Sequence, residues 1–288
     1  MTVLVTGATG NVGSAVVRAL VERGEPVRAF VRDPTRLPGG VEAAVGDFAD
    51  AAALDRALEG VNRVFLSSGD GPQKVAHETA VIRAAAAAGV ALIVKASTWG
   101  AEAGSTVPGL DWNGRIEDHL RASGLPAVCL RSGFYMTNVL AAADQVRGAG
   151  MLPAPAGSGT IAMIDPRDVG AVGAAVLGSD GHAGRRYALT GPEAISYREV
   201  AAALSAATGR PIEYVDVPPD AARQAFAGAG MPDWMVRQLD GVFDLIRRGE
   251  LAQTTDTVRV LTGRDPRGFA EFAHDHRAAF GAGEPVRA

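Results

Sequence analysis

Three glycines at a spacing of three residues follow the first apolar run of the chain and constrain its fold more than any other feature. The run from Val3 to Thr6 has the pattern of a strand, and Thr6-Gly7-Ala8-Thr9-Gly10-Asn11-Val12-Gly13 leads into an amphipathic helical pattern. Gly7 permits a tight turn, Gly10 lets the backbone approach a pyrophosphate, and Gly13 lets a helix pack closely on a strand. A strand, a glycine turn and a helix in this order predict a phosphate-binding βαβ unit.

Alternating strand and helix patterns through the first two thirds of the chain predict a parallel sheet. Short apolar runs predict further strands at 26–31, 42–45, 63–66, 92–95, 127–131 and 186–189. Segments between them, several of them rich in alanine, predict helices at 12–22, 52–58, 75–88, 116–122 and 168–177. Such alternation is typical of βαβ units, so we expect an α/β fold of the Rossmann type with a doubly wound parallel sheet.

The pattern changes after Gly191. Helical segments separated by proline and glycine follow at 196–208, 220–229, 233–248 and 269–280, and only 212–217 has the pattern of a strand. We therefore expect a dinucleotide-binding domain over residues 1–191 and a smaller, mainly helical carboxy-terminal lobe over 192–288 that caps the substrate. Residues 134–160 are expected to line the substrate cleft, and 148–159 to form a loop rich in glycine, proline and alanine.

Charge and composition argue against several classes of protein. The 28 Lys and Arg residues balance 32 Asp and Glu residues without a long run of either sign, which argues against a nucleic-acid binder or a polybasic membrane anchor. The chain shows no apolar window long enough for a membrane span and no charged leader, and its single cysteine, Cys129, leaves no internal disulfide. We expect a cytoplasmic protein with a small-molecule substrate and without nucleic acid, membrane or metal; monomer and homodimer both stay open.

The end of the predicted second strand indicates which dinucleotide is bound. Arg32 and Asp33 stand roughly 20 residues after the glycines, where the residue that reads the ribose belongs. An arginine there favours a 2′-phosphate through charge-assisted, forked contacts, whereas an acid would bond a free 2′-hydroxyl and repel phosphate. The sequence favours NADP, and Asp33 keeps NAD as the alternative.

Polar residues also follow the third and fourth predicted strands. Asp47 and Phe48 come after the third, and Ser67 and Ser68 come after the fourth. Ligands of open α/β sheets bind at the carboxyl ends of the strands, so these residues are candidate cofactor contacts. For Asp47, capping of the next helix is an alternative interpretation.

These motifs resemble the short-chain dehydrogenase/reductase superfamily, and within it the atypical NmrA-like branch. The resemblance spans nearly the whole chain and includes 27–34, 46–48, 123–126, 130–138, 164–169 and 189–192. The tail, with 230–232 and 261–266, resembles bacterial relatives of the ergot-alkaloid iminium reductases such as agroclavine dehydrogenase. The resemblance implies cofactor contacts from Gly7, Thr9, Gly10, Asn11, Val12, Gly13, Arg32, Asp47, Phe48, Ser67, Ser68 and Phe134.

The acid/base pair of ordinary superfamily members is absent from this sequence. Those enzymes protonate the product through a Tyr-x-x-x-Lys pair beside a serine, and none of the four tyrosines here has a lysine four residues later. Ser97 ends the fifth predicted strand as the serine should, but Asn113, which cannot titrate, stands where many NmrA-like enzymes place His or Lys. We expect catalytic positions at Ser97, Tyr135 and Asn113, and substrate contacts from Thr98, Trp112, Tyr135, Met136 and Asn138.

The leading hypothesis is a reductase that transfers hydride from NADPH to a ketone, quinone or cyclic imine of a small aromatic or polycyclic secondary metabolite. Addition to an iminium needs no proton donor, whereas a ketone or quinone needs a donor: Ser97, Thr98, Tyr135, a bound water or a hydroxyl of the substrate. The alternative is a non-enzymatic NmrA-like regulator that senses the dinucleotide, which the missing pair favours. The intact carboxy-terminal lobe, without an added basic or disordered arm, favours the enzyme. A sugar-nucleotide epimerase shares the glycine motif but also relies on the missing tyrosine.

Overall fold

The computed structural model describes residues 2–281, and these divide into two compact units that each combine several stretches of sequence. Unit 1 holds the residues up to 132 together with 166–189 and 257–264; unit 2 holds 133–165, 190–256 and the residues from 265 onward. The chain passes from unit 1 to unit 2 between residues 189 and 190, close to the domain boundary expected after residue 191. The stretch 133–165 belongs to unit 2, and 257–264 belongs to unit 1 because α10 (Thr257–Thr262) packs there on α6 (Pro166–Leu177).

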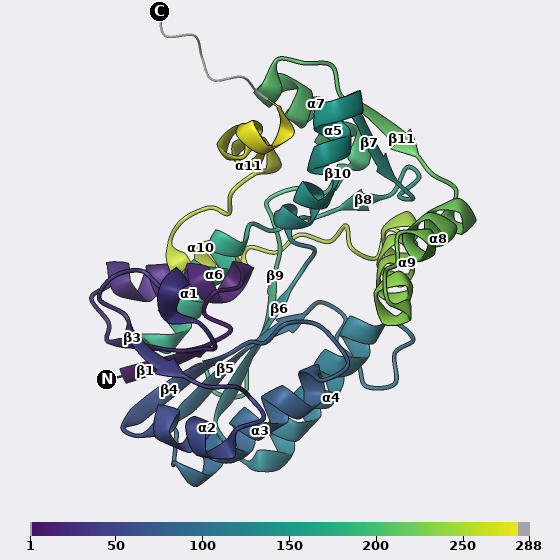
Figure 1. The fold of residues 1–288 in the computed structure, drawn as a ribbon. Helices are drawn as coiled ribbons and strands as arrows, with labels where there is room; N and C mark the ends of the chain where they lie inside the picture. Colours follow the sequence, from purple (N-terminus) through teal and green to yellow (C-terminus); the bar gives the residue numbers. More distant parts are fainter. Residues whose placement is uncertain (1, 282–288) are drawn as a thin grey trace, which may run out of the picture. The chain divides into compact units, whose positions relative to one another are not determined.

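Unit 1 is built around a seven-stranded parallel sheet with the order β3-β2-β1-β4-β5-β6-β9 (Figure 1). Its strands are β1 (Thr2–Thr6), β2 (Val27–Val31), β3 (Glu42–Val45), β4 (Val61–Leu66), β5 (Leu92–Thr98), β6 (Ala127–Ser132) and β9 (Arg186–Leu189). In register, Val3 of β1 pairs with Val27 on one side and Arg63 on the other. The strand order reverses between β1 and β4, and this is the switch point at which open α/β sheets bind ligands. The predicted fold class is confirmed.

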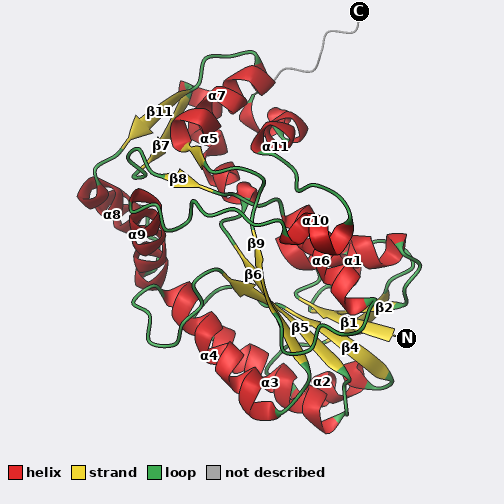
Figure 2. Ribbon diagram, turned by 180° about the vertical axis from the view of Figure 1, so that it is seen from behind, coloured by secondary structure: helices red, strands yellow, loops and turns green. Residues whose placement is uncertain are grey.

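Helices cover both faces of this sheet, which explains why its central strands are continuous apolar runs. One face carries α1 (Asn11–Glu22) and α6, and the other carries α2 (Ala51–Leu58), α3 (Lys74–Ala87) and α4 (Pro108–Ser123) (Figure 2). The first pair packs closely because Gly170 lies against α1, where a Cβ would come within 2.6 Å of the Ala15 carbonyl carbon. Leu4, Phe65 and Ile93 are fully buried between the two layers.

The fourth helix of unit 1 begins earlier than its apolar pattern predicts. A helix was expected over 116–122, but α4 starts at Pro108, where proline is well tolerated because the first helical N–H groups have no partner inside the helix. The added turns carry Asn113, which therefore lies inside the helix rather than at its start. Gly114 lies one residue further on, and a Cβ there would come within 2.2 Å of the Ala103 nitrogen, so the preceding loop crosses the helix at this point.

Unit 2 contains two small sheets and most of the remaining helices. In the first sheet β7 (Met151–Ala154) pairs in parallel with β11 (Glu213–Asp216), and in the second β8 (Thr160–Ile161) pairs with β10 (Ile195–Ser196). The prediction of a loop over 148–159 is wrong, because 151–154 finds its strand partner some sixty residues later along the chain. The helices of this unit are α5 (Ala143–Ala149), α7 (Tyr197–Thr208), α8 (Pro219–Gly228), α9 (Asp233–Arg247) and α11 (Phe269–Asp275), together with the 3-10 turns η2 (Met136–Ala142) and η3 (Arg277–Phe280).

Three further observations concern the described residues as a whole. None of their helices is long and apolar enough to cross a membrane. They contain no group of three or more His, Cys, Asp or Glu side chains that could hold a metal ion. Cys129 on β6 is buried, and this burial raises the pKa of its thiol to about 11.

Candidate functional site

The turn after β1 is a cradle of bare backbone. Gly7 has a φ of 61°, in the left-handed region that favours glycine, and its carbonyl accepts a hydrogen bond from the Gly10 nitrogen at 2.9 Å. A Cβ on Gly13 would come within 2.1 Å of that same carbonyl oxygen, and a Cβ on Gly7 within 2.8 Å of the Ser67 carbonyl oxygen. Side chains are therefore excluded from both positions by the close packing of the turn on α1 and on the end of β4, and Gly10 between them is exposed.

The first helix begins in a way that suits a bound anion. Gly10 is its N-cap residue, makes no side-chain cap, and is followed by no acidic residue in the first turn. The first-turn N–H groups of a helix lack intrahelical acceptors, and the helix dipole makes this end positive. The turn and the start of α1 thus fit the pyrophosphate of a dinucleotide, and the contacts expected from Asn11 and Val12 stay predictions.

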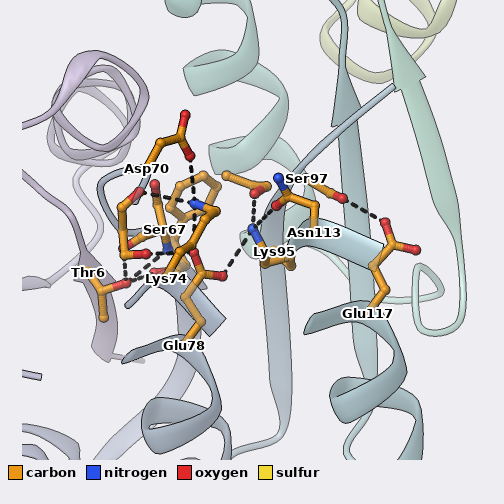
Figure 3. Close-up of polar contacts among 12 residues, drawn as sticks. Thr6, Ser67, Asp70, Lys74, Glu78, Lys95, Ser97, Asn113 and Glu117 are labelled. Carbon is orange, nitrogen blue, oxygen red and sulfur yellow. Dashed lines mark hydrogen bonds and ion pairs between the residues drawn. The ribbon is translucent and has the colours of Figure 1, made fainter. Parts of the chain in front are cut away.

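Thr6 ties this turn to the end of the neighbouring strand β4. Its fully buried hydroxyl donates to the Ser67 carbonyl oxygen at 2.7 Å and accepts from the Ser67 nitrogen at 2.9 Å (Figure 3). The two strand ends on either side of the switch point are therefore fixed to each other. Ser67 and Ser68 lie here as predicted for the exit of the fourth strand.

Of the two arginines in and after β2, the one that follows the strand is exposed and the one near its start is used by the fold. Arg32 is exposed directly after the strand. Arg28 instead binds Glu42 at 2.7 Å and the carbonyl oxygens of Ala57 and Glu59, so it joins β2 to β3 and to the end of α2. Asp33 accepts from the Thr35 nitrogen at 2.9 Å, and this backbone hydrogen bond lowers the pKa of its carboxyl. Arg32 is thus the cation that this strand end offers to a ligand.

At the exit of β3, Asp47 is exposed and does not cap the next helix. Its carboxylate accepts from the Ala49 nitrogen at 3.0 Å, whereas the N-cap of α2 is Asp50, which accepts from the Ala53 nitrogen at 3.1 Å. The capping interpretation of Asp47 is wrong. Phe48 packs beside it against Phe30 and stacks on His77, with ring centroids 5.5 and 5.2 Å away.

A buried group of charges, formed by Lys74 and Glu78 of α3 and Lys95 of β5, was not predicted from the sequence. Glu78 of α3 is fully buried between two lysines: its Oε1 lies 3.0 Å from Lys74 Nζ and its Oε2 lies 3.0 Å from Lys95 Nζ (Figure 3). Burial opposes the charge on Glu78, but the two lysines outweigh it and hold the pKa of that carboxyl below its usual range. Burial lowers the pKa of Lys95, while Glu78 and Asp70 together raise that of Lys74 despite its burial.

Asn113 of α4 is bound to this group of charges. Its Oδ1 accepts from Lys95 Nζ at 2.9 Å and its Nδ2 donates to the Gly109 carbonyl oxygen at 2.8 Å, and only 6% of the residue is exposed. The structure thus brings Asn113 together with a lysine that lies far away in the sequence. Its amide is held from both ends inside unit 1.

Ser97, the predicted catalytic serine, lies on the same strand as Lys95 but binds a different acid. Its hydroxyl donates to Glu117 Oε1 at 2.6 Å, and Arg131 binds the same carboxylate with two hydrogen bonds, at 2.9 and 2.7 Å. Burial opposes the charge on Glu117, but the bonds from Arg131 and Ser97 prevail and lower the pKa of its carboxyl. Thr98 and Trp112, predicted to contact substrate, are both partly buried in unit 1.

The remaining predicted site residues belong to unit 2. Phe134 and Tyr135 precede η2, where the Tyr135 backbone bridges to Ile164. Met136 is 1% exposed and lies in the apolar core of this unit, so it packs the interior. Their roles, and that of Asn138, stay predictions.

The sheet order and the glycine turn place this chain in the class of Rossmann-type α/β proteins. A narrower assignment comes from comparison with known families. The model of the NmrA-like family matches residues 1–272, so the chain belongs to the NmrA-like family, as its motifs predict.

Two curated relatives match this chain over nearly their whole length. NAD(P)H azoreductase of Xenophilus azovorans is 40% identical over 284 residues, which cover 97% of this chain and 99% of that protein. (4-alkanoyl-5-oxo-2,5-dihydrofuran-3-yl)methyl phosphate reductase of Streptomyces griseus subsp. griseus is 41% identical over 282 residues, which cover 96% of this chain and 99% of that protein. Among solved structures, the NADPH-dependent quinone oxidoreductase QOR2 of Escherichia coli, complexed with NADPH, matches with a TM-score of 0.86 at 31% identity, over 95% of this chain and 99% of that one.

Proposed function

We propose that this protein is an NADPH-dependent reductase of small, conjugated organic acceptors. The observation that carries the proposal is the bare glycine cradle at the start of α1, with the exposed Arg32 at the neighbouring strand end. The cradle suits a pyrophosphate, and a free guanidinium beside it suits a 2′-phosphate. The names of the relatives agree with NADP as the cofactor and with an oxidoreductase rather than a non-enzymatic regulator.

The cofactor, when bound, supplies hydride from its nicotinamide ring. The protein binds and orients it: the glycine turn holds the pyrophosphate, and Arg32 holds the 2′-phosphate. The other proposed contacts are Asp47, Phe48, Ser67, Ser68 and Phe134.

Proton supply decides which acceptors this site can reduce. Hydride addition to a ketone leaves an alkoxide, and a positioned acid usually accelerates such a step by about 10² to 10⁴. Ser97 already donates its hydroxyl hydrogen to Glu117, and both ends of the Asn113 amide are bound inside unit 1. Acceptors that delocalise the added charge or become neutral, such as a quinone or a cyclic iminium, suit these residues better than an isolated ketone.

The relatives' names point the same way. They are named for an azo compound, an oxo-dihydrofuran and a quinone, which are all unsaturated acceptors. We propose an aromatic or polycyclic secondary metabolite with a quinone or a cyclic imine, bound in its protonated iminium form, as the natural substrate, and a ketone as the slower case.

The proposal is tested by turnover with three acceptors built on one aromatic ring system: a quinone, a cyclic imine and a ketone. The quinone or the imine should oxidise NADPH catalytically, and the ketone should react at least about tenfold more slowly, since no protein acid assists it. Fastest turnover with the ketone would contradict the acceptor class. NADPH binding without turnover of any acceptor, together with stoichiometric binding of a protein partner, would instead indicate a regulator.

A further inference from the structure

The chain has 28 basic residues of the Lys and Arg types, and only two of them are lysines, Lys74 and Lys95. Both are buried, with 5% and 0% of their side chains exposed, and both contact the same carboxylate, Glu78. They lie 21 positions apart in the sequence, on α3 and β5. The two lysine side chains thus converge on one buried acid.

Each of these ammonium groups has three oxygen neighbours, some of them hydrogen-bonded and some in ion-pair contact only. Lys74 Nζ binds Glu78, Asp70 at 3.2 Å and the Ser68 carbonyl oxygen at 3.2 Å. Lys95 Nζ binds Glu78, Asn113 and the Ala96 carbonyl oxygen. An ammonium group points its three donors in three directions, whereas the planar fork of arginine cannot, which explains why lysine stands at both positions.

The contacts of Lys74 and Glu78 concentrate on the loop that leaves β4. Ser68 donates its hydroxyl hydrogen to Glu78 Oε1 at 2.8 Å while its carbonyl oxygen accepts from Lys74. One residue earlier, Ser67 is bound to Thr6 at the glycine turn. The loop is therefore fixed by hydrogen bonds at two successive residues, Ser67 and Ser68, beside the switch point of the sheet (Figure 3).

Stability alone is a weak reason for such an arrangement. Removing three charged groups from water is costly, and well-packed apolar residues of similar volume often stabilise a fold as well or better. Buried charges are best explained where they fix a particular geometry. Here the geometry that they fix is that of the Ser68 hydroxyl and carbonyl.

We propose that Glu78 and Lys74 are positioning residues for the dinucleotide, acting through Ser68 and the loop between β4 and α3. The inference rests on the proposed function, since it assumes that this loop contacts NADPH. Lys95 links Glu78 to α4, because its Nζ contacts Glu78 and donates a hydrogen bond to Asn113. Neither lysine touches the cofactor: they hold the loop in the conformation that binds it.

The scarcity of lysine gives a direct test on the unaltered protein. Selective labelling of lysine with ¹³C at Cε gives two side-chain NMR signals, assigned with the variant Lys74→Met. During an NADPH titration, the Lys74 signal should shift along the same binding curve that NADPH fluorescence reports. Saturation of the fluorescence while both lysine signals stay in place would overturn the proposal. No fluorescence change at all would instead count against the proposed function.

A pair of variants separates positioning from stability. Glu78→Gln keeps the shape of the side chain but removes the charge that both lysines share. Arg63→Met is the matched control. Arg63 lies on β4, the strand that leads into this loop, but near the start of the strand and away from the loop. There it binds the carbonyl oxygens of Leu177 and Ser179 and the carboxylate of Asp180. Both variants should lower Tm.

Only Glu78→Gln should weaken NADPH binding, by at least about fivefold in Kd at a temperature where both variants are folded, which is less than the loss of one direct charge-assisted contact because Glu78 acts through Ser68. Equal Kd values for Glu78→Gln and the unaltered protein, or equal weakening by both variants, would contradict the proposal. Should Glu78→Gln fail to fold, the lysine titration of the unaltered protein decides.

Discussion

The Ser97 hydroxyl donates its hydrogen to the Glu117 carboxylate across 2.6 Å, and this contact changes what the serine can do. Arg131 and Arg186 bind the same carboxylate, so it stays charged and keeps accepting. A serine whose only hydrogen is held in this way can accept a hydrogen bond from a ligand but is a poor source of a proton. We therefore expect this serine to orient a reactant rather than to protonate a product.

Replacing Ser97 by alanine should lower kcat by less than about tenfold, because a dedicated catalytic acid is worth about 10² or more. Steady-state kinetics with a quinone acceptor would measure this effect. Tyr135→Phe, which removes another hydroxyl expected in the site, should likewise cost less than about tenfold. A loss of about a thousandfold in either variant, with substrate affinity unchanged, would show that the protein does supply a proton.

Glu117 should make the stability of the fold depend on acid pH. Its pKa in the folded protein is lowered from the ordinary value of 4.5, so its stabilising contribution is complete above pH 4.5 and is lost as the pH falls through the lower native pKa. Urea unfolding of the parent and of Glu117→Gln, followed from about pH 6 to about pH 3, would measure this. The free energies of unfolding should differ most at the higher pH and converge in acid. Parallel curves would contradict the assignment.

Gly13 should be intolerant of even one added methyl group. The Cβ of Gly13→Ala would lie 2.1 Å from the Gly7 carbonyl oxygen, and both residues belong to the glycine turn proposed to hold the cofactor. Relieving such overpacking costs about 1 to 3 kcal/mol and would displace the turn, so NADPH binding should weaken at least about tenfold. Gly228→Ala is the matched control, because a Cβ there meets nothing within 4 Å. Unchanged NADPH affinity in Gly13→Ala would argue against a cofactor in this cradle.

Most of the sheet could be predicted because its strands are buried on both faces. The apolar runs around Leu4, Phe65 and Ile93 alone fit either a buried helix or a buried strand. The glycine turn and the helix that follows it indicate a βαβ unit, and therefore strands. The same reasoning failed for β7, where Pro153 indicates a break. Proline is tolerated there because β7 lies in a two-stranded sheet, in which one side of each strand is free.

In the candidate site, features that depend on neighbouring residues in the sequence could be predicted, and contacts between residues distant in the sequence could not. The glycine turn and Arg32 follow from their positions at strand ends. The network around Glu78 does not, because Lys95 and Asn113 meet across two elements. A signal was nevertheless present in the sequence: Lys74 and Glu78, one turn apart, fall on the same face of α3 as the buried Val81 and Ile82. Charges on an apolar face require partners in the interior.

The most direct test of the account is the affinity of the protein for NADPH against NADH, measured by fluorescence titration with the parent and with Arg32→Ala. A single charge-assisted contact to the 2′-phosphate is worth about 1.5 to 3 kcal/mol, so NADPH should bind at least about tenfold more tightly than NADH in the parent. Arg32→Ala should remove most of this difference while leaving the affinity for NADH nearly unchanged. Equal affinities of the parent protein for the two cofactors would contradict the assignment of an NADPH-dependent reductase.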